Sequence, residues 1–236
     1  MALVTGSGRR LGAALAVAFA RAGYDVAIHH HRSADGAAAT ARRVMETGGR
    51  AEIFAADLRS PTAIEALFDE VGNHLGRLDC LVNSAAVFPL APWPELTPGI
   101  WDEVLAVNLT APFLCVKAAE PLIRAGGGGH VVNVVDLSAF EAWIDRPACG
   151  VAKAGLLKLT QSLARALAPD ILVNAVAPGS VDIPGEPATT PLPSPRRLPL
   201  RRWATPEDVS EAVLFLARTR YVTGQCIVVD GGKLLL

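Results

Sequence analysis

Two neighbouring stretches of the chain place groups that can do acid–base chemistry. Asp136 ends an apolar strand predicted over 130–135, and Cys149 and Lys153 follow, one helical turn apart. A cationic amine beside a thiol lowers the thiol pKa, so Cys149 can exchange protons. A carboxylate at a strand end can hold the amino groups of a ligand and help deliver a proton. The alternatives are that Asp136 caps the next turn and that Cys149 is an inert small residue in a cavity.

The first two dozen residues predict a turn that would bring a cofactor to these groups. An apolar strand over 2–4 precedes a glycine-containing turn over 5–12, and an Ala-rich helix follows to about Gly23. This order brings backbone N–H groups and the positive end of a helix dipole to one point, where a pyrophosphate can bind. Gly6 permits the tight turn, and Gly12 lets the helix approach the strand.

Basic residues occur where the phosphates of a dinucleotide would lie. Arg9 and Arg10 stand at a helix start, where positive charge opposes the dipole, which indicates a bound anion; two surface arginines are the alternative. The second strand ends in a stretch with no acid, 29–33, which contains His31, Arg32 and Ser33. A 2′-phosphate needs cationic or hydroxyl donors, so this stretch predicts NADP. A metal-binding histidine tract is disfavoured because alternate strand residues point to opposite faces.

Composition limits the partners. The chain has 236 residues, a formal net charge of −1 and 51% hydrophobic residues. This balance provides no global field for nucleic acid or an anionic membrane, and we find no apolar run of about 18 residues and no cleavable leader. We expect a cytoplasmic protein that binds small molecules and copies of itself. The four cysteines show no metal-ligand spacing and are expected to be reduced.

Strand and helix patterns alternate along the whole chain. They predict an α/β, doubly wound Rossmann fold in one domain over 1–236, with a seven-stranded parallel sheet of order 3-2-1-4-5-6-7 and helices on both faces. Residues 180–202 are rich in proline and arginine and are the predicted substrate lid. A helix predicted over 99–124 contains a proline, Pro112, at which we expect a kink.

The glycine turn resembles that of the short-chain dehydrogenase/reductase family, TGxxxGxG, with Arg10 in place of the middle glycine. Within that family the chain is similar to pteridine reductases. Four features carry this resemblance, namely Arg9-Arg10-Leu11-Gly12, His31-Arg32-Ser33, Phe88 and Asp136. The resemblance implies an NADPH-dependent reduction of a dihydropterin to a tetrahydropterin, in a homotetramer.

The resemblance also assigns roles to residues. Phe88 would stack on the pterin, while Asp136, Arg10 and an ordered water would bind it and manage the proton. Asn108 would shape the active-site backbone and hold a relay water. The residues implied in cofactor binding are Gly6, Arg9, Arg10, Leu11, Gly12, His31, Arg32, Ser33, Asp57, Leu58, Asn83, Ser84, Ala85, Lys153, Pro178, Gly179 and Ser180. Asp57 and Leu58 would contact the adenine, although Asp57 is also placed to cap the helix that starts near Pro61.

One position departs from the family pattern. The family motif is Tyr-x-x-x-Lys, in which the lysine binds the nicotinamide ribose and depresses the pKa of the proton-donating tyrosine. Here the lysine, Lys153, is present and Cys149 replaces the tyrosine; Tyr24 and Tyr221 are far along the chain. Two rival functions therefore stay open. One is a carbonyl or 3-oxoacyl reductase, and the other is a catalytically silent NADP-binding protein.

Overall fold

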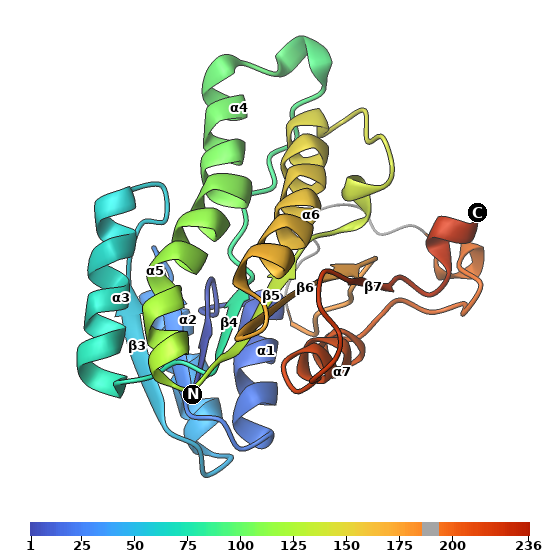
Figure 1. Cartoon of the computed structure of the whole chain (residues 1–236). Helices are drawn as coiled ribbons and strands as arrows, with labels where there is room; N and C mark the ends of the chain where they lie inside the picture. Colours follow the sequence, from blue (N-terminus) through green and yellow to red (C-terminus); the bar gives the residue numbers. More distant parts are fainter. Residues whose placement is uncertain (186–193) are drawn as a thin grey trace.

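Seven parallel strands form one sheet at the centre of the computed structural model, which describes residues 1–185 and 194–236 (Figure 1). Their order is β3-β2-β1-β4-β5-β6-β7, as predicted. The strands are β1 (Ala2–Val4), β2 (Val26–His30), β3 (Ala51–Ala55), β4 (Cys80–Asn83), β5 (Gly129–Val134), β6 (Ile171–Pro178) and β7 (Cys226–Val229). Because all are parallel, the segments that follow them meet at one edge of the sheet.

Helices cover both faces of the sheet and bury an apolar cluster on each. One face carries α1 (Arg10–Arg21), α2 (Ala34–Met45) and α7 (Pro206–Leu216). The other face carries α3 (Pro61–Leu75), α5 (Ala111–Ala125) and α6 (Pro147–Leu167), and α4 (Pro98–Leu105) packs beside α6. Short 3₁₀ turns are Trp93–Glu95, Leu137–Ala139, Pro195–Arg197 and Lys233–Leu235.

Three helices begin with the same local device, a hydroxyl N-cap followed by proline. The Ser60 hydroxyl accepts from the N–H of Ala63 at the start of α3, and Thr97 and Thr205 cap α4 and α7 in the same way. A proline at the first helical position loses no hydrogen bond there, so the pair is a strong helix start. The expectation that Asp57 caps α3 is therefore wrong, because Ser60 is the cap.

The predicted long helix is interrupted by one π turn, η2 (Ala106–Thr110), between α4 and α5. Pro112 lacks the N–H that would otherwise bond back to Asn108, so the irregularity lies before the proline instead of as a kink at it. Within residues 1–185 and 194–236, one helix, Pro98–Ala125, is long and apolar enough to cross a membrane by length and composition alone. Here its α5 part packs on α3 and the sheet, and the absence of a membrane partner stays a prediction.

Candidate active site

The glycine turn follows β1 and packs against the segment after β4. Gly6 has a φ of +68°, and a Cβ on it would lie 2.8 Å from the Cα of Ala85. A Cβ on Gly12 would lie 2.4 Å from the carbonyl oxygen of Gly6. The hydroxyl of Thr5, which sequence reasoning missed, accepts from the N–H groups of Ser84 and Ala85 at 3.0 and 3.1 Å. The turn therefore needs both glycines and leaves its backbone close to the β4 end, a cradle that fits a dinucleotide.

Arg10 occupies the place of the family's middle glycine and pays a conformational cost for it. Its φ is +54°, in the left-handed region that favours glycine. A non-glycine residue held there costs on the order of 1 kcal/mol or more, and such strain is commonly found at functional sites. This backbone conformation explains why the family pattern has a glycine at this position. The strain of an arginine there is consistent with a functional role for its side chain.

His29 locks the turn to β2 and β3. Its Nδ1 accepts from the N–H of Gly6 at 3.0 Å, so its Nε2 must carry the proton and donate to the carbonyl of Ala56 at 3.1 Å. Burial is the largest cause that lowers the pKa of this imidazole, to about 4. His29 is therefore a neutral structural residue. Its role explains part of the histidine run without a metal ion.

This lock predicts a pH-dependent stability. His29 is neutral in the folded chain down to about pH 4, whereas the unfolded chain takes up the proton near pH 6.5. The contribution is complete above pH 6.5, and about 3 kcal/mol of unfolding free energy is lost as the pH falls to 4. In His29→Gln, whose amide can both accept and donate, denaturant titrations between pH 7 and 4 should show a shallower loss. His74→Gln, at an exposed imidazole that pairs with Glu52 at 3.0 Å, measures what the loss of a surface histidine does to the slope. An unchanged slope in His29→Gln would contradict the assignment.

The residues expected to hold the 2′-phosphate lie at the surface beside the turn. His31 and Arg32 are exposed, and the Ser33 hydroxyl lies 2.4 Å from where a Cβ on Gly8 would be. His31 Nε2 also lies 3.7 Å from the carboxylate of Asp57. No acid occurs in 29–33, so the donors fit a 2′-phosphate and lack the acceptor that a 2′-hydroxyl would need. The predicted cofactor, NADP, fits this site.

Asp57 is held as an acceptor by its own loop. The Arg59 guanidinium donates to both carboxylate oxygens, and this hydrogen bonding holds the pKa of Asp57 at about 2, well below its usual range. Its Oδ1 also accepts from the N–H of Arg59 at 3.0 Å, so this carboxylate caps its own loop and not α3. The prediction that Asp57 and Leu58 contact the adenine stays a prediction.

Asp136 follows β5 at the carboxyl edge of the sheet and is half-buried. Its Oδ1 accepts from the N–H of Ser138 at 2.8 Å and from the Ser138 hydroxyl, while its Oδ2 has no hydrogen-bond partner among the described residues. Asp136 therefore caps the short turn Leu137–Ala139, as one alternative predicted. The cap uses one carboxylate oxygen and leaves the other for a ligand.

Lys153 and Cys149 are both buried on α6, and they differ in character. The Lys153 ammonium donates to the carbonyl of Val134 at 2.7 Å, and burial lowers its pKa. Cys149 lies in an apolar cluster with Phe88 and Leu109. Burial is the largest cause that raises the pKa of its thiol, to about 11, and the neighbouring Lys153 offsets this only in part. The expectation of a lowered thiol pKa is therefore wrong, because desolvation outweighs the ammonium.

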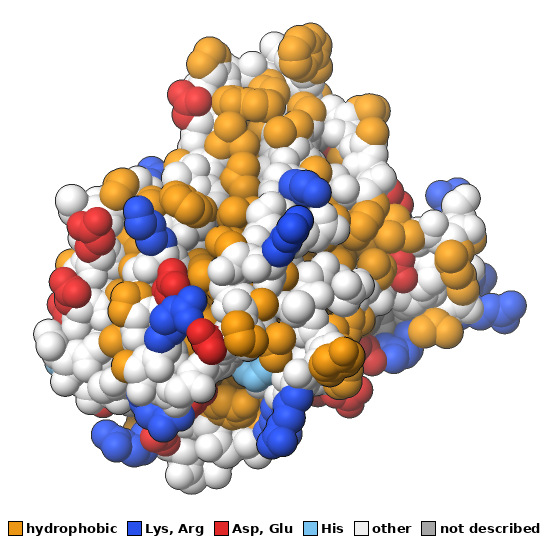
Figure 2. All heavy atoms as spheres, in the orientation of Figure 1, with side chains coloured by type: hydrophobic (Ala, Val, Ile, Leu, Met, Phe, Trp, Pro, Cys, Tyr) orange, Lys and Arg blue, Asp and Glu red, His pale blue; other side chains and the backbone are white. Residues whose placement is uncertain are grey.

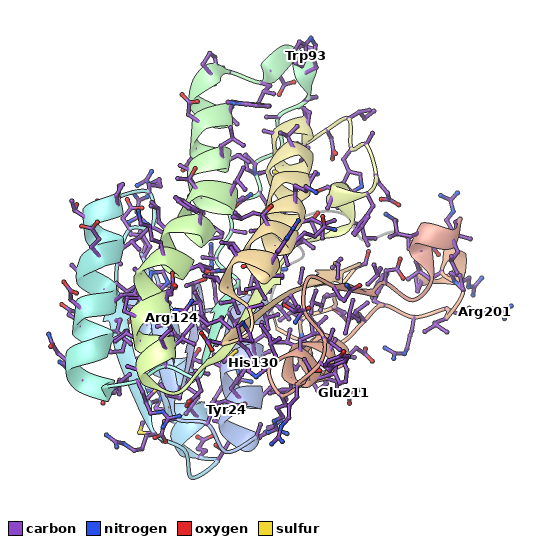
Figure 3. The ribbon with its side chains drawn as sticks, viewed as in Figure 1. Tyr24, Trp93, Arg124, His130, Arg201 and Glu211 are labelled. Atoms are coloured by element: carbon purple, nitrogen blue, oxygen red, sulfur yellow. The ribbon has the colours of Figure 1, made fainter. Side chains whose placement is uncertain are left out.

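Neither tyrosine of the chain replaces the missing phenol. Tyr24 packs at the α1–α7 side (Figure 3), where its hydroxyl donates to the carbonyl of Ala217. Tyr221 is fully exposed.

Asn108 shapes the backbone that leads into Phe88. From the π turn, its amide donates to the carbonyl of Val87 at 2.8 Å, and its oxygen accepts from the N–H of Val87 at 2.9 Å. The buried Asn108 side chain thus has the hydrogen-bond partners that a polar group among apolar residues was predicted to need. This contact fixes Phe88 beside α6, in the same cluster as Cys149.

At the other strand ends, the remaining predicted residues close the site. The N–H of Gly179 donates to Val229 at 2.9 Å, and a Cβ on Gly179 would lie 2.8 Å from the Cα of Asp230. Pro178 is the last residue of β6, and Ser180 accepts from Ala204. Of the predicted lid, 180–202, the part 186–193 lies outside the described residues.

Sequence reasoning missed the residues that surround Phe88. The guanidinium carbon of Arg146 lies 5.4 Å from the centroid of the Phe88 ring, and Trp143 packs edge-on against the same ring at 6.0 Å. Lys233, from the C-terminal tail, lies over Trp143 and pairs with Glu141 at 2.8 Å. No local signal points to Arg146, because it lies just before α6 and its contact is with Phe88, far away in the chain.

Residues 6–233 match a family model described as enoyl-(acyl carrier protein) reductase. The chain belongs to the short-chain dehydrogenase/reductase family. This family's members are nicotinamide-dependent oxidoreductases, and the chain has the sheet order and a buried lysine expected of a member.

Three proteins show how far the likeness of this chain to characterised family members extends. The acetoin dehydrogenase YohF of Salmonella typhimurium is 31% identical with a TM-score of 0.91, over 100% of this chain and 96% of that one. The landomycin C-6 ketoreductase LanV, solved with bound NADP and rabelomycin, is 34% identical with a TM-score of 0.90, over 100% and 96%. A 3-oxoacyl-[acyl-carrier-protein] reductase of Synechocystis is 30% identical, over 100% of this chain and 97% of that protein.

Proposed function

We propose that this short-chain reductase uses NADPH to reduce a C=N bond in a flat dihydropterin ring. The observation that carries the proposal is the contrast between Asp136 and Cys149. Asp136 presents an unpartnered Oδ2 at the end of β5, whereas the thiol at the family's proton-donor position is buried with its pKa raised to about 11. The group available to move a proton is thus a carboxyl at the position where the resemblance places the pterin's donors.

The residues around Asp136 divide the remaining work. When bound, NADPH supplies a hydride, which adds to the ring carbon while a proton adds to the ring nitrogen. Lys153, held by Val134, fits the nicotinamide ribose, and Phe88, fixed by Asn108, offers a face for the ring. Asp136 holds ring donors through Oδ2, and the proton comes from its carboxylic acid or from a water. An imine-type nitrogen accepts a proton more readily than a carbonyl oxygen. Reduction of C=N therefore depends less on a tyrosine hydroxyl as proton donor than reduction of a ketone does.

A substrate panel tests the proposal. NADPH oxidation is followed with 7,8-dihydrobiopterin, a dihydromonapterin-type substrate, acetoin and a 3-oxoacyl thioester, beside titrations of NADPH against NADH. Turnover of the pterins with NADPH preferred is the expected result. Turnover of the ketones alone would overturn it. Tight NADPH binding without any turnover would favour the catalytically silent protein.

The second candidate is a carbonyl or 3-oxoacyl reductase, which the comparisons favour. LanV is a ketoreductase solved with NADP, and the Synechocystis relative is a 3-oxoacyl reductase. In this chain such a reaction has to proceed without the phenol, because Cys149 is 1% exposed in an apolar cluster. The candidate therefore makes a specific prediction about restoring that group.

Cys149→Tyr separates the two candidates. If the ancestral chemistry was ketone reduction, the variant should gain ketone turnover by about 100-fold, the low end of what a positioned acid contributes. Under our proposal the rate of dihydropterin reduction changes less than about threefold, because Asp136 already provides the route for the proton. Initial rates on both substrates make the measurement, with Cys226→Ala, at a distant thiol, as the control. A large gain on the pterin would contradict the proposed role of Asp136.

We also propose a cytoplasmic homotetramer. Hydrophobic side chains gather on the face formed by α4, α5 and α6 (Figure 2). Large apolar residues stand exposed on these elements or just before them, among them Trp93, Phe113 and Val151. Exposed apolar patches of this kind commonly mark subunit contacts. Light scattering of the purified protein tests the assembly.

A further inference from the structure

A row of cationic and aromatic side chains lies between the start of α6 and the C-terminal tail. Arg146 caps α6, and its guanidinium carbon lies 5.4 Å from the Phe88 ring centroid. Phe88 meets Trp143 edge-on, and Lys233 Nζ lies 5.5 Å from the Trp143 ring centroid. Phe88 shares a cluster with Cys149, so this row forms the wall of the site on the side of the α6 N-terminus.

Arg146 is the member of the row whose hydrogen bonds are incomplete. It is 6% exposed, and its Nη1 donates to the carboxylate of Asp145. Its Nε is buried and has no hydrogen-bond partner among the described residues, and Nη1 makes the side-chain hydrogen bond that the guanidinium has with them. A buried N–H of a cation without an acceptor is costly, so an acceptor is expected at the Nε side of the guanidinium.

The Nε–Nη2 edge of the Arg146 guanidinium is suited to one class of ligand. Nε and Nη2 point to the same side of a guanidinium and match the two oxygens of a carboxylate. The chain shows this elsewhere, because Arg59 holds Asp57 through Nε and Nη2 at 3.0 and 2.6 Å. Asp145 occupies the opposite end of Arg146, which leaves this edge for a ligand from outside the chain.

We propose that Arg146 binds a carboxylate of the substrate through its Nε–Nη2 edge, and is thereby a specificity-determining residue. The inference rests on the proposed function for the placement of the ring on Phe88. Arg146 is the N-cap residue of α6 and precedes Lys153 by seven residues, which corresponds to roughly 10 Å along the helix axis. A carboxylate bound there is too far away to sit on the reacting atoms. The substrate class is a flat ring with a carboxylate on its substituent.

Two dihydropterins that differ in this group test the proposal. 7,8-Dihydrofolate carries carboxylates on its substituent and 7,8-dihydrobiopterin carries none. Arg146→Met should raise KM for dihydrofolate by about 10- to 100-fold, the range of one charged hydrogen-bonded pair, and leave KM for dihydrobiopterin within about twofold. Arg146→Lys should recover part of the loss, because it keeps the charge without the planar edge. Arg220→Met, at an exposed arginine, is the matched control.

A binding experiment separates this inference from the proposed function. NADP-saturated protein is titrated calorimetrically with benzoate and benzamide, with melting temperature and NADPH affinity confirming the fold of each variant. Tighter binding of benzoate than of benzamide, lost in Arg146→Met, supports the carboxylate site even if no pterin is turned over. Equal binding of the two probes, or an unchanged dihydrofolate KM in a folded Arg146→Met, overturns it.

Discussion

Asp136→Asn should lower kcat for a dihydropterin by 100-fold or more while the protein stays folded. The asparagine oxygen can still accept from the N–H of Ser138, so the cap on the turn Leu137–Ala139 is kept. The amide cannot release a proton at neutral pH, and a positioned acid contributes about 10²- to 10⁴-fold. Steady-state rates, with NADPH affinity and melting temperature measured beside them, test this expectation.

Two variants control for the position and for the chemistry. Asp102→Asn makes the same change at an exposed acid of α4 and should leave kcat unaltered. Ser138→Ala removes the hydroxyl that bonds to Asp136 Oδ1 and should cost less than Asp136→Asn, because Oδ2 is untouched. If Asp136→Asn kept turnover within about threefold, Asp136 would be a cap alone.

Gly36→Ala should destabilise the protein and weaken NADPH binding together. Gly36 lies in the first turn of α2, and a Cβ there would stand 2.1 Å from the carbonyl oxygen of Gly8 in the nucleotide-binding turn. Backbone has to shift to relieve such a contact, which costs about 1–3 kcal/mol, or roughly 3–10 °C in Tm. The shift also moves Ser33, which packs on Gly8, so the NADPH dissociation constant should rise about tenfold.

Gly99→Ala is the matched control for this substitution. Gly99 also lies in the first turn of a helix, α4, and a Cβ there would meet its nearest neighbour, the Thr97 hydroxyl, at 4.0 Å. Alanine is favoured over glycine in a helix by about 0.8–1.0 kcal/mol, so this variant should be slightly stabilised. Calorimetry and an NADPH titration of both variants make the comparison. A stabilised Gly36→Ala would show that the contact relaxes without cost.

Local chemistry explains why much of the fold was predictable. Hydroxyl–proline pairs start α3, α4 and α7, and apolar strands alternate with helices along the chain, so element order and sheet order follow from short-range patterns. The glycine turn could be predicted equally well, since a side chain on Gly6 or Gly12 would clash with nearby backbone. Arg10, which stands where the family pattern has glycine, has a positive φ, in the region that favours glycine.

The sequence by itself thus determined the family, the sheet and the positions of Asp136, Lys153 and Asn108, because each depends on spacing along one element or on a strand end. Tertiary structure alone decided the state of Cys149, whose pKa burial raises although a lysine is one turn away. It also decided that Arg146 meets Phe88. These outcomes depend on desolvation and on contacts between distant segments, and no local pattern encodes either.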